Sequence, residues 1–167
     1  CLGKVGTYFS TINSAISIMK YSKEDIKVKI INVCGEWDNE KNLIKDNNID
    51  LIDLNFSYFK YLPKNGFLGS RISNMIIFFF SILPLTRLLK KEKPDFLIAH
   101  LLTSLPILLF NLLNIKTKLI LRISGFPRLT IFRRELWNRF SKKIFKISCP
   151  SKDLLKQLEK QKIFALD

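Results

Sequence analysis

The sequence contains few of the residues that build metal centres and disulfide frameworks. Among its 167 residues there is one histidine, His100, and there are three cysteines, Cys1, Cys34 and Cys149. The cysteines are odd in number, lie far apart and form no Cys-x-x-Cys or Cys/His spacing, so neither a zinc site nor a disulfide framework is indicated. Reduced thiols are typical of cytosolic proteins. The sequence therefore predicts no metal site and a cytoplasmic location.

Acidic residues are also scarce. Fourteen Asp and Glu stand against 28 Lys and Arg, and residues 116–167 alone hold fourteen basic and four acidic residues, a net charge of +10 out of +14. Such a surface suits phosphate groups of nucleic acid, anionic lipid or a nucleotide-type ligand, or it is simply solvated. A basic nucleic-acid-binding module is one alternative function. It is disfavoured because the aromatic residues are mostly Phe inside apolar runs and no recognition motif occurs.

Long uninterrupted apolar runs are missing as well. The two most apolar stretches, residues 75–85 and 101–113, fall short of the roughly 18 to 20 residues that a spanning helix needs. Pro84 and Pro106 interrupt them, and charged residues flank them. We therefore expect core helices, or helices that lie on a bilayer surface. A small integral membrane protein with two spans remains an alternative.

What the chain does contain is an alternation of strand-like and helix-like segments. Strands are predicted at residues 26–33, 49–55, 96–99, 116–124 and 146–150, with another beginning at 162–167. Helices are predicted at residues 8–21, 70–91, 102–113, 133–145 and 152–160. This alternation predicts an α/β fold, a doubly wound parallel sheet with helices on both faces.

Local signals mark several of the predicted boundaries. Thr7, Ser70 and Ser151 are candidate N-caps, because a hydroxyl at this position accepts a hydrogen bond from the first helical turn. The helix predicted at residues 70–91 ends in basic residues just before Pro94. The chain then leads into residues 96–99, which we expect to form a buried strand.

Three predicted strands end on polar groups. His100 follows residues 96–99, Arg122 lies near the end of residues 116–124, and the loop "CGEW" follows the first strand. In open parallel sheets, ligands bind outside the carboxyl ends of the strands. We therefore expect these groups to share one rim of the sheet, with a satisfied core histidine as the alternative for His100.

Four segments, in this order and spacing, carry a resemblance to a known family. "GKVGT" resembles a glycine-bearing loop before the first helix, "PDFLIAH" a strand ending in histidine, "LRISGFP" a strand and loop, and "KISCPSKDLLKQL" a strand with a capped helix. Together they resemble the N-terminal domain of GT-B fold glycosyltransferases, of the family 4 (group 1) type that includes transferases of lipopolysaccharide and capsule assembly. The resemblance implies a Rossmann-like domain that forms one half of a two-domain enzyme.

The resemblance also implies roles for particular residues. Gly3, Gly6 and Thr7 would lie in the loop that faces the acceptor and the donor phosphates, where backbone N–H groups at a helix start approach anions closely. An ordinary tight turn is the alternative. His100 would lie near the transferred sugar or the acceptor, where it donates a hydrogen bond, and it is the candidate catalytic residue.

Two further groups are candidate substrate-binding residues. Arg122 offers a guanidinium fork for phosphate or carboxylate, and Ser124 and Gly125 can expose backbone N–H groups beside it. Glu36 and Trp37 can grip a sugar through a carboxylate and an indole face. The alternatives are pairing of Arg122 with an acid such as Glu36, and a surface loop with a packed tryptophan.

The implied enzyme is a glycosyltransferase of the hexosyltransferase type. It would move a sugar from a nucleotide-sugar donor, its co-substrate, to a cell-surface glycan or a lipid-linked acceptor. It would need no metal or other cofactor, since side chains and helix dipoles neutralise the donor phosphates. Residues 1–167 would be its acceptor side, lacking the first strand and the C-terminal donor-binding domain, and would be inactive alone. Basic and apolar surface helices would attach it peripherally to the inner face of the cell membrane.

Overall fold

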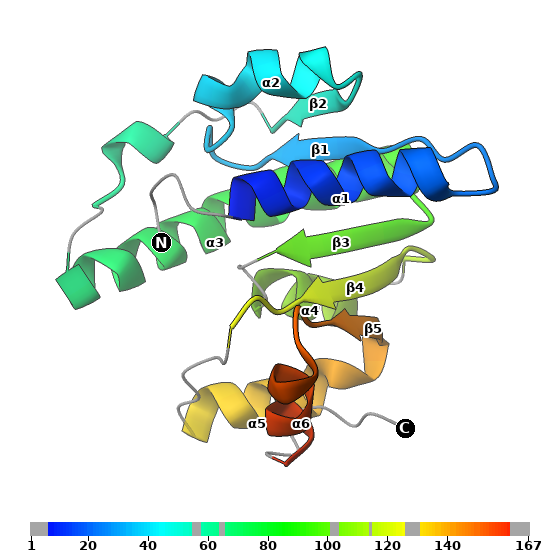
Figure 1. The fold of residues 1–167 in the computed structure, drawn as a ribbon. Helices are drawn as coiled ribbons and strands as arrows, with labels where there is room; N and C mark the ends of the chain where they lie inside the picture. The colour runs from blue at the N-terminus through cyan, green and yellow to red at the C-terminus, as the bar shows by residue number, and fades with distance from the viewer. Residues whose placement is uncertain are drawn as a thin grey trace. The chain divides into compact units, whose positions relative to one another are not determined.

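The computed structural model describes residues 7–54, 58–63, 66–100, 104–113, 115–125 and 131–160. The chain divides into two compact units, Cys1–Leu85 and Thr86–Asp167, and each is described by itself. Both units combine helices with a parallel sheet, so the protein is an α/β protein with parallel strands (Figure 1).

The first unit is built around a two-stranded parallel sheet. Its elements are α1 (Thr7–Tyr21), β1 (Lys29–Asn32), η1 (Asp38–Glu40), α2 (Lys41–Asp46), β2 (Asp50–Asp53), η2 (Phe59–Tyr61) and the start of α3 (Gly66–Glu92). The strands pair in register from Lys29 with Asp50 to Asn32 with Asp53. α1 runs along β1 (Figure 1), and a core forms from Ile12, Ala15, Ile30, Trp37, Ile44 and Ile49.

The second unit holds a three-stranded parallel sheet in the order β3-β4-β5. Its elements after α3 are β3 (Phe96–His100), α4 (Ser104–Leu112), β4 (Lys118–Arg122), α5 (Ile131–Phe140), η3 (Ser141–Lys143), β5 (Ile144–Ser148) and α6 (Lys152–Lys160). Successive side chains of a strand point to opposite faces, so the alternation in β4 buries Leu119 and Leu121 completely. Ile107 and Leu109 of α4 in the same unit are buried as well.

Two boundaries that the sequence predicted are confirmed. α3 ends at Glu92, after which Lys93 adopts a positive φ of 46° and Pro94 follows, a combination that stops a helix. At the start of α6, the Ser151 Oγ accepts a hydrogen bond from the backbone N–H of Leu154 at 3.2 Å, as an N-cap does.

Other boundaries differ from prediction. α3 begins at Gly66, so Ser70 lies inside the helix and not at its N-cap position. The helix predicted at residues 133–145 ends at Phe140, and β5 starts at Ile144, because tertiary strand pairing overrides the local apolar spacing. The short helix α2 was not predicted, and the strand predicted at 162–167 lies outside the described residues.

β3 is not the fully buried strand that its composition predicted. Its alternate residues Phe96 and Ile98 are exposed, and the ring of Phe96 lies 5.9 Å from that of Phe145 on β5. The Lys118 ammonium lies over both rings, 5.5 Å and 4.8 Å from their centroids. The sheet therefore has an exposed face on which a lysine covers two aromatic rings.

The first apolar run belongs to a helix that is longer than the run itself. The helix that contains it is long enough, and over Arg71–Glu92 apolar enough, to cross a membrane by length and composition, with a mean hydropathy of 1.8. In the same helix, Ile72 lies before the run and Leu88 and Leu89 lie after it, and Pro84 lies inside the helix. Only 28% of the apolar window is buried within the protein.

Candidate functional site

The carboxyl edge of the sheet in the second unit brings three polar residues into line. His100 is the last residue of β3, Arg122 is the last of β4, and Ser148 is the last of β5. The strand register pairs His100 with Arg122 and Arg122 with Ser148. The structure therefore brings the predicted His100 and Arg122 together, and adds Ser148, which the sequence reading treated only as part of a short strand.

His100 is half-buried at this edge, and its surroundings keep it uncharged. Burial, and to a smaller extent the positive charge of Arg122, together lower the pKa of His100 from 6.5 to about 4. At neutral pH the imidazole is therefore neutral, with one nitrogen that donates and one that accepts a hydrogen bond. This form suits contact with a hydroxyl group better than contact with an anion.

Ser124 and Gly125 come two and three residues after Arg122, beyond the buried Ile123, and are both exposed. A Cβ atom at Gly125 would meet no atom within 4 Å, so there is open space in front of the backbone at this position. Ser124 and Gly125, which were predicted to bind substrate, are thus open to solvent. They lie near the end of the strand that carries Arg122, whose partner in the register is the neutral His100.

Glu36 lies in the first unit, and its carboxylate organises the loop after β1. It accepts hydrogen bonds from the backbone N–H groups of Val33 at 3.0 Å and Cys34 at 2.7 Å. Burial and the nearby Glu36 carboxylate raise the pKa of the Cys34 thiol, so Cys34 stays protonated. Glu36 therefore acts as a turn-forming residue in this structure.

Trp37 is a core residue, as the packed-tryptophan alternative expected. Its side chain is only 7% exposed, and its ring packs edge-on against Tyr8 with centroids 4.7 Å apart. The Tyr8 hydroxyl in turn donates to the backbone carbonyl of Glu36 at 2.7 Å. The indole faces are covered by the core, so we do not retain the sugar-gripping role for Glu36 and Trp37.

Asn32, at the end of β1, is the buried polar residue that the sequence reading missed. Its amide nitrogen donates to the carboxylates of Asp38 and Asp53, at 3.0 Å for Asp38. Its Oδ1 accepts from the backbone N–H groups of Gly35 and Trp37, each at 3.1 Å. The Asn32 side chain thus holds the whole loop after β1. The sequence feature that could have indicated this role is an asparagine at the end of a strand, just before a glycine turn.

The two carboxylates beside Asn32 are balanced by a lysine. The Lys41 ammonium lies 3.3 Å from a carboxylate oxygen of both Asp38 and Asp53. Gly35 has a φ of 90°, which only glycine adopts without strain, so the turn itself is encoded locally. Because each member has a partner in the network, this cluster explains the loop's shape without a ligand.

The glycine loop at the start of the chain cannot be compared with prediction. Gly3 and Gly6 lie outside the described residues, and Thr7 is described only as the first residue of α1. Within the described residues, no group of three or more His, Cys, Asp or Glu side chains is arranged to hold a metal ion.

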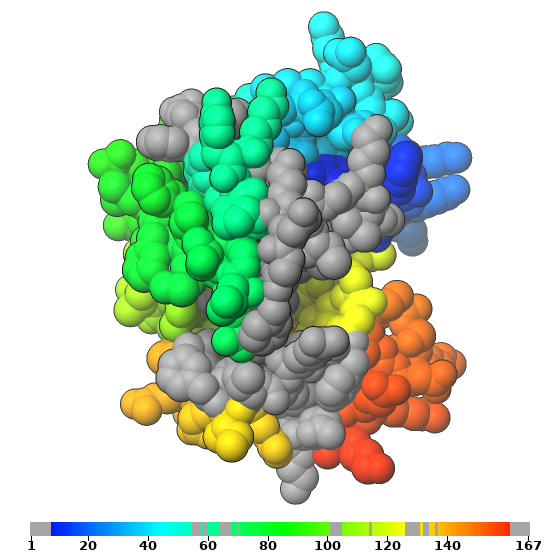
Figure 2. All heavy atoms as spheres, turned by 90° about the vertical axis from the view of Figure 1, so that its left-hand side faces the viewer, coloured from blue at the N-terminus to red at the C-terminus, as the bar shows by residue number. Residues whose placement is uncertain are grey.

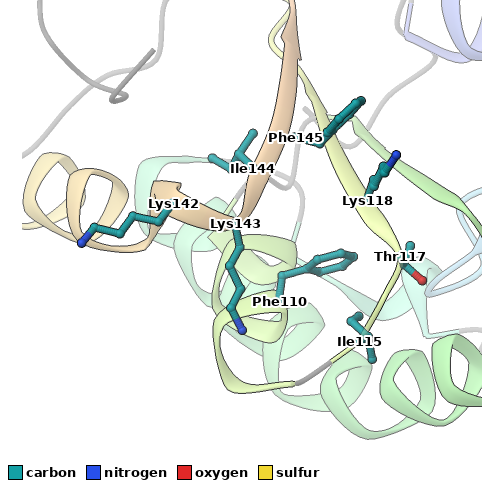
Figure 3. Close-up of a pocket in the computed structure, with 8 residues that line it drawn as sticks. All are labelled: Phe110, Ile115, Thr117, Lys118, Lys142, Lys143, Ile144 and Phe145. Atoms are coloured by element: carbon teal, nitrogen blue, oxygen red, sulfur yellow. The ribbon is translucent and has the colours of Figure 1, made fainter. Parts of the chain in front are cut away.

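A shallow pocket of about 350 Å³ lies at the opposite end of the second unit's sheet, near the first residues of β4 and β5 (Figure 3). Lys118, Lys142 and Lys143 line it, but their ammonium groups point in different directions. Lys143 donates to the backbone carbonyl of Leu113 at 3.4 Å. The cations do not converge on one point, and none of the predicted site residues lines this pocket.

Comparison with known proteins adds no relative. No family model, no curated protein and no solved structure matches this chain. What is known of its site therefore rests on the geometry just described.

Proposed function

We propose that the chain is the acceptor-side, Rossmann-like half of a GT-B type glycosyltransferase, with a doubly wound parallel sheet. The observation that carries the proposal is the alignment of His100 with Arg122 at the carboxyl ends of adjacent parallel strands. Ligands of open α/β sheets bind at this edge. The ordered resemblance of four sequence segments to such enzymes supports the same assignment.

Each residue at this edge has a distinct proposed role. Neutral His100 donates a hydrogen bond to a sugar hydroxyl near the reacting centre, and Arg122 binds a phosphate or carboxylate of the acceptor or donor. Ser124 and Gly125 present backbone N–H groups in the open space beside them. A second domain would hold the nucleotide sugar, and the acceptor would be a cell-surface glycan or a lipid-linked sugar.

The test uses the full-length protein. Release of nucleoside diphosphate is measured from UDP- and GDP-sugars in the presence of a bacterial lipid extract, for the wild type and for His100→Gln and Arg122→Gln. Loss of a charged hydrogen bond corresponds to roughly 10- to 100-fold in kcat/KM, which we expect for Arg122→Gln. For His100→Gln we expect about a 10-fold loss, with little change in Tm.

The matched control is Lys118→Gln. Lys118 also lies on β4, but at its amino end, away from the proposed site. The Lys118→Gln substitution should leave turnover unchanged. Equal losses for Lys118→Gln and Arg122→Gln, or losses of activity that follow Tm alone, would refute the proposal. Gly125→Ala supplies a further check, since its Cβ enters the open space without contacting described atoms and should raise KM while Tm is kept.

A further inference from the structure

One face of α3 within the first unit is apolar and exposed. The stripe consists of Leu68, Ile72, Met75, Phe79 and Leu83, whose side chains are between 50% and 71% exposed. Their spacing of four, three, four and four residues places them on one side of an α-helix. α3 (green) lies at the surface in the view of Figure 2. This stripe is far more apolar than a solvated helix face needs to be.

The opposite face of the same helix is fixed to the protein by specific contacts. Ser73 is buried, and its hydroxyl lies 2.7 Å from the backbone carbonyl of Pro63 and 2.9 Å from that of Gly69. Ser81 is also buried and lies 3.4 Å from the Tyr58 hydroxyl. These contacts determine which side of α3 faces inward, so the stripe is held outward by the fold.

Basic residues stand at both ends of the stripe. Of the five charged residues in α3, four are basic, namely Arg71, Arg87, Lys90 and Lys91, and the fifth is Glu92. Between Arg71 and Arg87 the helix carries no charge. An apolar stripe flanked by cations complements a bilayer surface, where acyl chains accept the apolar groups and anionic headgroups accept the cations.

We propose that the α3 stripe is a membrane-docking surface that lies flat on an anionic lipid bilayer. The 22 residues of Arg71–Glu92 are long enough to cross a bilayer, but they include Arg87, Lys90, Lys91 and Glu92. The charge-free stretch between Arg71 and Arg87 spans only about 24 Å at roughly 1.5 Å per residue, less than the roughly 30 Å of hydrocarbon that a spanning helix crosses. A spanning α3 would also have to break the contacts of Ser73 and Ser81 with the rest of the first unit. The inference rests on α3 alone and stands whether or not the protein is a glycosyltransferase.

The test is sedimentation of the purified chain with lipid vesicles. One set is phosphatidylcholine alone, and the other contains about one-third phosphatidylglycerol. We expect binding to the anionic vesicles and at least 10-fold weaker binding to the neutral ones, since each basic residue near the surface contributes about fivefold. The double variant Ile72→Ser/Phe79→Ser should weaken binding to anionic vesicles at least 10-fold.

The matched control is Leu112→Ser/Ile131→Ser, which removes two exposed apolar side chains from the second unit. This variant should bind vesicles like the wild type. Three results would overturn the proposal: equal loss of binding by the control, a fall in Tm of several degrees for the α3 variant, or protein that only detergent releases from membranes. A change from dimer to monomer in the α3 variant without vesicle binding by the wild type would instead identify a second copy as the occupant.

Discussion

The pH dependence of stability around His100 follows directly from its position at the strand end. The histidine has a pKa of about 4 in the folded protein, against 6.5 for the same group in an unfolded chain. Between these values the unfolded state binds a proton that the folded state excludes. The free energy of unfolding contributed by His100 is therefore intact above pH 6.5, falls as the pH drops from 6.5 to 4, and levels off below 4.

The size of this loss follows from the pKa difference. Since each pKa unit corresponds to about 1.4 kcal/mol, the wild type should lose about 3 kcal/mol between pH 7 and pH 4 because of this one group. Other groups titrate in the same range, so the comparison is with His100→Gln, which keeps a donor and an acceptor but does not titrate. The difference between the two proteins isolates the histidine.

Two measurements give the result. Urea unfolding at pH 7 and pH 4, followed by tryptophan fluorescence, yields the free energy of unfolding of both proteins, and Trp137 lies buried in the same unit as His100. NMR titration of the imidazole gives the folded pKa without ambiguity, because the chain has one histidine. The reasoning would be refuted if the free energies of unfolding of the wild type and of His100→Gln changed equally with pH and the imidazole titrated near 6.5.

Three further predictions concern single substitutions. Arg122→Gln should raise the pKa of His100 but leave it below 6.5, because burial is the larger cause of its depression; the same NMR titration checks this. Asn32→Ala should lower the free energy of unfolding by about 2 to 4 kcal/mol, since it leaves buried N–H groups of the loop without their acceptor; urea unfolding measures it. Leu109→Ala in α4 should cost about 2 to 5 kcal/mol in the same assay, whereas Leu112→Ala, three residues on and 77% exposed, should change stability by less than about 0.5 kcal/mol.

Local sequence signals located some elements well and others poorly. The end of α3 was predictable because Lys93 and Pro94 together stop a helix whatever surrounds them. The N-cap at Ser151 was predictable for the same reason, since a hydroxyl serves the first turn of its own helix. The junction of α5 and β5 was not, because Ile144 and Phe145 suit a helix as well as a strand until β4 provides a pairing partner.

The sequence by itself determined the α/β alternation, the basic character and the placing of His100 at a strand end, because periodicity, charge and strand boundaries are properties of neighbouring residues. Only the tertiary structure decided that His100 lies beside Arg122, that Trp37 enters the core and that Asn32 holds the loop after β1. It also decided which side of α3 is left exposed, since a helix apolar all round has no preferred face until neighbours cover one. Contacts between residues far apart in the chain depend on strand order and packing, which local composition does not encode.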